Sequence, residues 1–289
     1  MLSEEQIQQA VYWACKQEVM APKPGNVNCF SDGHEMVVND FLLSAKAIAP
    51  IMAKPGLSVG ERILFSIQAT RAVVNTNTNL GIVLLMAPLC HAAAQIADFD
   101  QLPEALNNVL THLSRDDANY CYEAIRLAEA GGLGKAAEQD ISGTPTVTLL
   151  EAMKMAEERD QIALQYVSNF KTLWQVGLPT LTNALESGES VEWATAFAYL
   201  MLLSDAPDSL ILRKHSWPQA IAVTEKAKQL VFEMKKNSRL DASLHQLTAW
   251  DNQLKQDAIN PGTTADLVAA TLLLHAFQHE LPAHRISVP

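Results

Sequence analysis

Apolar residues recur at helical spacing along most of the chain, whereas alternating patterns typical of strands extend over only a few residues. Three capping boxes, which begin at Ser3, Ser58 and Thr148, mark expected helix starts. The helices that they open should end near residues 20, 74 and 170. Further helices are expected at residues 38–52, 80–97, 116–129, 193–203, 218–235, 243–256 and 264–279. The pattern predicts an all-α fold, in which residues 1–289 form a single compact multi-helix domain.

The expected helix at residues 80–97 differs from the others because it is apolar on nearly all sides. Helices of this kind are normally surrounded by other elements, so we place it at the centre of the core. Its apolar run at residues 82–90 is too short to cross a bilayer. The joining loops are polar by contrast, and we expect them to form an active-site cleft.

Composition and charge narrow the classes of partner. The chain has 289 residues, 48% of them apolar, which suffices for a large core. Its formal net charge of −11 disfavours nucleic acid as a partner, because an acidic protein repels a phosphate backbone. A small anionic ligand remains compatible with this charge, since a few local donors or a divalent cation can hold it.

The spacing of the cysteines and the N-terminal residues 1–5 indicate in which cellular compartment the protein is expected. The four cysteines are widely spaced and show no CxxC pattern, which indicates reduced core thiols. Residues 1–5 are polar and acidic and lack the basic start and apolar stretch of a signal peptide. We therefore expect a cytoplasmic protein that does not associate with membranes.

The first candidate loop surrounds Lys23. Pro22 and Pro24 stiffen the backbone on both sides of this lysine, and Gly25 permits a tight turn. A rigid lysine is a good donor to phosphate, although a plain helix–helix turn explains the loop equally simply. Downstream, residues 34–35 are a His–Glu pair, which suggests an acid/base or metal role or else two surface residues.

The second candidate loop is residues 75–81, where five short polar residues precede the apolar helix. Their side chains and the free N–H groups of the helix start together make a natural anion site. A helix cap needs only one such residue, so the run favours a functional role.

Two further segments contain carboxylates. Residues 260–266 include Thr263 and Asp266 at capping-box spacing, and Asp266 could equally be a magnesium ligand. Residues 205–215 combine two aspartates with a basic triplet. Metal and phosphate contacts or a solvated turn both explain this second segment.

Five segments, taken in order, resemble the motifs of the CitG/MdcB family, the triphosphoribosyl-dephospho-CoA synthases. The family motifs are PKPGLVD-like, GAH(Q)DM-like, NTHKG-like, DTNxxxRGG-like and SPGGSADLL-like segments. Their counterparts here are residues 22–28 (PKPGNVN), 33–36 (GHEM), 77–81 (NTNLG), 208–213 (DSLILR) and 260–267 (NPGTTADL). Each motif alone is weak, but five in the family's order, spread over nearly the whole chain, are fairly specific.

The resemblance implies an all-helical transferase that binds small-molecule nucleotides. Such an enzyme moves the triphosphoribosyl group of ATP to the 2′-hydroxyl of dephospho-CoA and releases adenine, with Mg²⁺ on the triphosphate. A homodimer is possible for such an enzyme. The implied nucleotide- and phosphate-binding residues are Lys23, Pro24, Gly25, Asn28, Asn77, Thr78, Asn79, Gly81, Arg213, Gly262 and Thr263. The implied catalytic residues are His34, Glu35, Asp208 and Asp266, and the implied magnesium ligands are Glu35, Asp208 and Asp266.

This chain also departs from the family pattern. Asn79 and Leu80 stand where the family has His and Lys, Asn28 replaces an aspartate, and residues 214–216 replace a glycine pair. Segments 117–126, 131–134 and 158–163 resemble a branch found in methanogens and methylotrophs, which use tetrahydromethanopterin. Three alternatives therefore stay open: a different acceptor in C1-cofactor biosynthesis, a non-catalytic nucleotide-binding protein and a magnesium-dependent phosphohydrolase.

Overall fold

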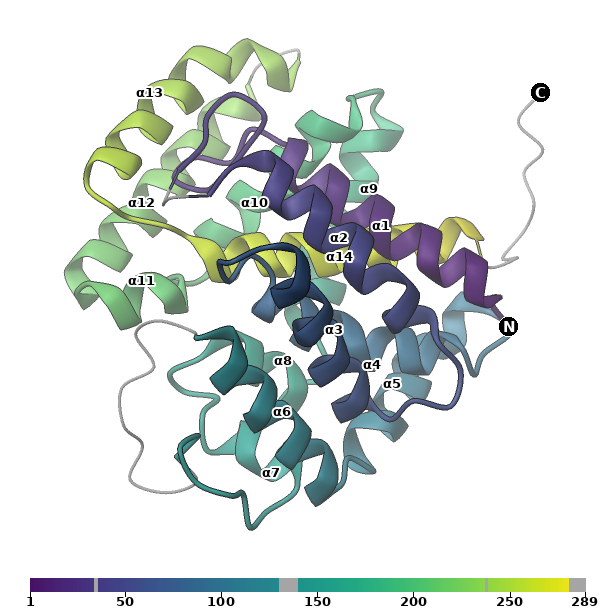
Figure 1. The fold of residues 1–289 in the computed structure, drawn as a ribbon. Coiled ribbons are helices and arrows are strands. Elements are labelled where there is room, and N and C mark those ends of the chain that lie inside the picture. Colours follow the sequence, from purple (N-terminus) through teal and green to yellow (C-terminus); the bar gives the residue numbers. More distant parts are fainter. Residues whose placement is uncertain (34–35, 130–139, 237–238, 281–289) are drawn as a thin grey trace.

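The computed structural model describes residues 1–33, 36–129, 140–236 and 239–280, and Figure 1 shows their arrangement. Within these ranges the chain forms fourteen α-helices, three short 3₁₀ or π turns and no strand beyond isolated bridges. The N-terminal helices are α1 (Glu4–Met20), α2 (Val38–Ala53), α3 (Val59–Val73), α4 (Leu80–Ala93), α5 (Leu102–Thr111) and α6 (Arg115–Ala128). The remaining helices are α7 (Leu149–Lys154), α8 (Gln161–Val167), α9 (Leu178–Glu186), α10 (Val191–Asp205), α11 (Ser209–Lys214), α12 (Trp217–Met234), α13 (Leu244–Gln256) and α14 (Gly262–Glu280).

One contiguous core joins both ends of the described chain, from Leu2 to Phe277. Helix α14 runs through its middle and packs against α1, α4, α9 and α10 (Figure 1). The predicted central position of the apolar helix is confirmed, because every residue of α4 from Ile82 to Cys90 is buried. The all-α fold class is confirmed by the helices of the described ranges, which form no sheet. Over the described ranges, no helix combines the length and the apolarity needed to span a bilayer.

The capping boxes predicted at Ser3, Ser58 and Thr148 all form. The prediction of one helix from residue 148 to residue 170 is wrong, however. Helix α7 ends at Lys154, and α8 starts anew at Gln161. The break occurs because the Asp160 carboxylate accepts hydrogen bonds from the N–H groups of Ile162 and Ala163, which caps a new helix start.

The capping box predicted at Thr263 does not form, because α14 already begins at Gly262. Its first turn is instead capped from another part of the chain. The N–H and hydroxyl of Thr264 both donate to Asp208, which lies just before α11. This long-range cap fixes the start of α14 against the start of α11.

Candidate active site

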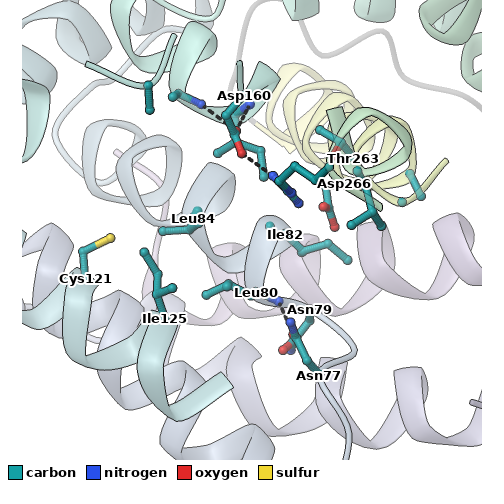
Figure 2. A pocket seen from close by; sticks show the side chains of 18 of the residues that line it. Asn77, Asn79, Leu80, Ile82, Leu84, Cys121, Ile125, Asp160, Thr263 and Asp266 are labelled. Carbon is teal, nitrogen blue, oxygen red and sulfur yellow. Dashed lines mark hydrogen bonds and ion pairs between the residues drawn. The ribbon is translucent and has the colours of Figure 1, made fainter. Parts of the chain in front are cut away.

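A cavity of about 560 Å³ lies where α4, α6, α7, α8, α11 and α14 meet. Eight of the predicted site residues line it: Asn77, Thr78, Asn79, Gly81, Arg213, Gly262, Thr263 and Asp266. Figure 2 shows Leu84, Cys121 and Ile125 on one side of this cavity and Thr263 and Asp266 on the other. The cavity thus has an apolar wall beside a polar one, an arrangement typical of small-molecule sites.

The turn before α4 is ordered by its own polar side chains. The side-chain oxygen of Asn77 accepts from the N–H of Leu80 at 3.1 Å, which caps the helix start. The hydroxyl of Thr78 lies 2.6 Å from that of Ser44, and the amide of Asn79 donates to Thr70 at 3.0 Å. These bonds hold the first turn of α4, with its unpaired N–H groups, at the cavity wall.

Gly81 and Asp266 form the closest approach between α4 and α14 at the cavity. A Cβ atom added to Gly81 would overlap the carboxylate of Asp266 and would lie 2.8 Å from Cδ1 of Ile162. Burial raises the pKa of Asp266 well above its usual range, and the nearby Glu18 and Asp208 act in the same direction. Only glycine at position 81 leaves room for this carboxylate.

Gly81→Ala is therefore expected to displace Asp266 from the cavity wall. Overpacking of this kind costs about 1–3 kcal/mol, and we expect catalytic turnover to fall at least ~10-fold. An activity assay and urea unfolding measure the two effects. Gly143→Ala is the matched control, since its Cβ would meet nothing closer than 3.5 Å. Full activity in Gly81→Ala would show that the position of Asp266 is unimportant.

Arg213 reaches the same cavity from α11 and pairs with Asp160, the residue that caps α8. Its Nη1 atom makes this ion pair, while its buried Nε atom has no hydrogen-bond partner. A guanidinium that lines a cavity and is held in place by one ion pair is well suited to bind an anion.

Asp208 does not line the cavity, and its roles as a catalytic residue and metal ligand stay predictions. Its side chain is fully buried. One oxygen accepts from the N–H groups of Leu210 and Ile211, and the other accepts from the N–H and hydroxyl of Thr264. With both oxygens occupied by two donors each, Asp208 is a structural cap for α11 and α14.

Asn26 is the residue of the Lys23 loop that lines the cavity. Four predicted phosphate ligands of the same loop do not line it: Lys23, Pro24, Gly25 and Asn28. Lys23 is fully buried and donates to Glu18, to the side chain of Asn26 at 2.6 Å and to the carbonyl of Val27 at 2.9 Å. An ammonium group has three N–H donors, and all three are used inside the protein. In this structure Lys23 is therefore placed to hold the loop together rather than to contact phosphate.

The same loop is tied to the C-terminal segment. Gly25 has φ of +82° and donates its N–H to Asp251 at 2.8 Å, and an added Cβ would lie 2.8 Å from Pro261. The amide of Asn26 donates to Asn260 at 2.9 Å. The amide of Asn28 bonds the loop's own carbonyls. The first and third candidate loops, far apart in sequence, thus lie side by side.

Sequence reasoning missed much of the cavity lining, including the carboxylates of Glu18 and Asp160. Glu18 lies in the last turn of α1 and pairs with Lys23. Burial raises the pKa of Glu18, and the positive charge of Lys23 partly offsets that effect. The five-residue separation between Glu18 and Lys23 is a weak signal, and nothing local in the sequence marks Asp160 as the partner of Arg213.

A magnesium site of Glu35, Asp208 and Asp266 is not assembled in the part of the chain that the structure describes. His34 and Glu35 lie outside the described residues. Among the described ones, no group of three or more His, Cys, Asp or Glu side chains could hold a metal ion. Of the two predicted ligands that the structure describes, Asp208 and Asp266, only Asp266 lines the cavity.

The profile of the CitG family, described as ATP:dephospho-CoA triphosphoribosyl transferase, matches residues 4–284. A Vibrio cholerae protein named 2-(5''-triphosphoribosyl)-3'-dephosphocoenzyme-A synthase is 25% identical over 290 residues, which cover 91% of this chain and 85% of that protein. A Pectobacterium carotovorum protein of the same name is 26% identical over 303 residues, which cover 95% of this chain and 90% of that protein.

A solved structure gives the same result. The crystal structure of an Archaeoglobus fulgidus protein, described as a triphosphoribosyl-dephospho-CoA synthase, matches with a TM-score of 0.61 and 27% identity. The match covers 82% of this chain and 98% of that one. The predicted resemblance is thus confirmed, and the alternative acceptor, the non-catalytic protein and the phosphohydrolase are not needed to explain the sequence. The chain belongs to the CitG family of ATP:dephospho-CoA triphosphoribosyl transferases.

Proposed function

We propose that this protein transfers the triphosphoribosyl group of ATP to the 2′-hydroxyl of dephospho-CoA and releases adenine in the cavity described above. The observation that carries the proposal is the polar wall of the cavity. There Arg213, which is held by its ion pair with Asp160, lines the cavity together with the first turns of α4 and α14. Helix N-termini and arginine are the two protein groups best suited to polyphosphate.

The triphosphate would bind at this polar wall. Gly81 and Thr263 belong to the first turns of α4 and α14, whose N–H groups have no partner within the helix. Arg213 would add positive charge from α11. This set replaces the lysine that the family carries in the motif before α4, since Leu80 here has an apolar side chain and its N–H already donates to Asn77.

The apolar wall would receive the adenine ring. Leu84, Ile125 and Met153 line it from α4, α6 and α7. An aromatic base loses little by leaving water for such a surface, and a pocket of mostly apolar side chains with a few polar groups fixes its orientation. The C1′ atom of the ribose would then lie between the two walls.

We further propose that Mg²⁺ enters with the triphosphate and that Asp266 is its protein ligand. Magnesium sites of this kind use one or two carboxylates together with substrate phosphates, so one cavity carboxylate suits such a site. The bound ion would neutralise phosphate charge. The cytoplasmic location and the homodimer also remain predictions.

The test is product analysis after incubation of the protein with ATP, Mg²⁺ and dephospho-CoA. We expect equimolar free adenine and a triphosphoribosyl adduct of dephospho-CoA by mass spectrometry, and neither product when the acceptor is omitted. ATP should also raise the melting temperature, because a ligand at 100 times its Kd stabilises the native state by about 2.7 kcal/mol. Release of inorganic phosphate without adenine would instead indicate a phosphohydrolase, and nucleotide binding without any product would indicate a binding protein.

A further inference from the structure

Glu18 is a buried carboxylate that lines the cavity, and one of its two oxygens has no hydrogen-bond partner. Its side chain is 1% exposed, and it lines the cavity from the end of α1. One oxygen, Oε1, accepts from Lys23, whereas Oε2 makes no hydrogen bond. Buried carboxylate oxygens rarely lack a donor, because the desolvation cost is then not offset. Because Glu18 lines the cavity, a ligand bound there is the natural source of the missing donor.

The surroundings of Glu18 fix its orientation. Lys23 binds Oε1 and is itself held by Asn26 and Val27. The hydroxyl of Tyr199 donates to the carbonyl of Pro24 at 2.7 Å, which anchors the neighbouring residue of the same loop. The carboxylate cannot rotate freely without breaking the buried ion pair, so Oε2 keeps its position. Such immobilisation of a reacting group is a feature of catalytic residues.

Within the proposed reaction, we propose that Glu18 is the general base, whose Oε2 accepts the proton of the acceptor hydroxyl, and that Lys23 is its positioning residue. This inference rests on the proposed function and adds a catalytic residue to it. Asp208 is excluded from this role because four donors already occupy its oxygens. Asn79, whose Oδ1 also lacks a partner on the cavity wall, accepts hydrogen bonds but does not act as a base.

The step balances without a further reactant. The acceptor oxygen forms a bond to C1′ of the ribose of ATP while its proton moves to Glu18. The bond between C1′ and N9 of adenine breaks, and N9 takes the bonding electron pair. Adenine takes up one proton as it leaves, and Glu18 gives up the proton that it took from the acceptor. Glu18 thus returns to its ionised form, and the reaction takes up or releases no proton overall.

Glu18→Gln is the direct test, because the amide keeps the size of the side chain and its acceptor for Lys23 but cannot take a proton. We expect kcat for adenine release to fall at least ~100-fold, in the range that loss of a general base normally produces. The Kd of ATP, measured by calorimetry, should stay within a factor of about three. Glu61→Gln is the matched control, since glutamine also forms the capping box at the start of α3.

The pH profile separates this role from a structural one. The titratable groups that interact with Glu18 are Lys23, Cys15 on the same helix, Tyr199 from α10 and Asp266 from α14. The wild-type kcat should fall on the acid side as Glu18 takes up a proton. Lys23→Met should shift this fall to higher pH, because the positive charge that favours the ionised form is lost.

Where Glu18→Gln does not fold, the double variant Glu18→Gln/Lys23→Met removes both buried charges together and should fold without activity. A folded variant of either kind that retains more than a tenth of the wild-type kcat would overturn the proposal. Full recovery of kcat at high Mg²⁺ would also overturn it, since Glu18 would then be a metal ligand. A wild-type protein that releases no adenine would instead refute the proposed function itself.

Discussion

Asp208→Ala is expected to lower the free energy of unfolding by about 3 kcal/mol, which is large for one substitution. The carboxylate caps two helices at once, and loss of a single helix cap costs about 0.5–2 kcal/mol. In addition, the buried N–H and hydroxyl of Thr264 lose their acceptor. Chemical denaturation monitored by circular dichroism measures this change.

The control for Asp208 is Asp205→Ala, three residues upstream, where the carboxylate is exposed at the end of α10. Its stability should stay within about 0.5 kcal/mol of the wild type. If Asp208→Ala were as stable as this control but inactive, Asp208 would be a functional carboxylate after all, as the family motif implies.

Arg213→Met is expected to lower kcat/KM for ATP by about 10²–10³-fold, because it removes a guanidinium group and its positive charge from the polar cavity wall. Methionine keeps much of the aliphatic volume, so the fold should persist. Steady-state adenine release at varied ATP measures the loss. Arg239→Met, at an exposed surface ion pair, is the control and should leave kcat/KM unchanged.

A second variant distinguishes phosphate binding from a purely structural ion pair. Asp160→Asn removes the charge that pairs with Arg213 but leaves an oxygen to cap α8. If Arg213 binds phosphate, Asp160→Asn should retain most of the affinity for ATP. Equal losses in both variants would mean that the pair with Asp160, rather than contact with ATP, explains the effect of Arg213.

Local signals in the sequence were sufficient to predict the fold class and several helix starts. Ser3, Ser58 and Thr148 are each satisfied by a residue three positions further along, so a short window of sequence contains the whole interaction. The start of α14 was not predictable in this way. Its cap comes from Asp208, which lies 56 residues before Thr264 and has no signature near α14 itself.

The candidate site shows the same limit. The turn of residues 77–81 was predicted to bind anions because polar residues directly precede an apolar helix, and the structure places that turn at the cavity. The phosphate role of Lys23 was inferred from its stiff neighbours and from the resemblance of its loop to a family motif. The pairing of Lys23 with Glu18 inside the core depends on how α1 ends against the loop, which residue type and spacing do not reveal.

The contact between Asn26 and Asn260 joins residues that are 234 positions apart, and the Gly25 turn packs against Pro261. During synthesis the first loop therefore emerges long before its partner, by roughly 10–50 s at typical elongation rates. Until then the turn that orients Glu18 lacks its support. The turn around Lys23 is therefore completed only after the C-terminal segment has been synthesised and has docked against it.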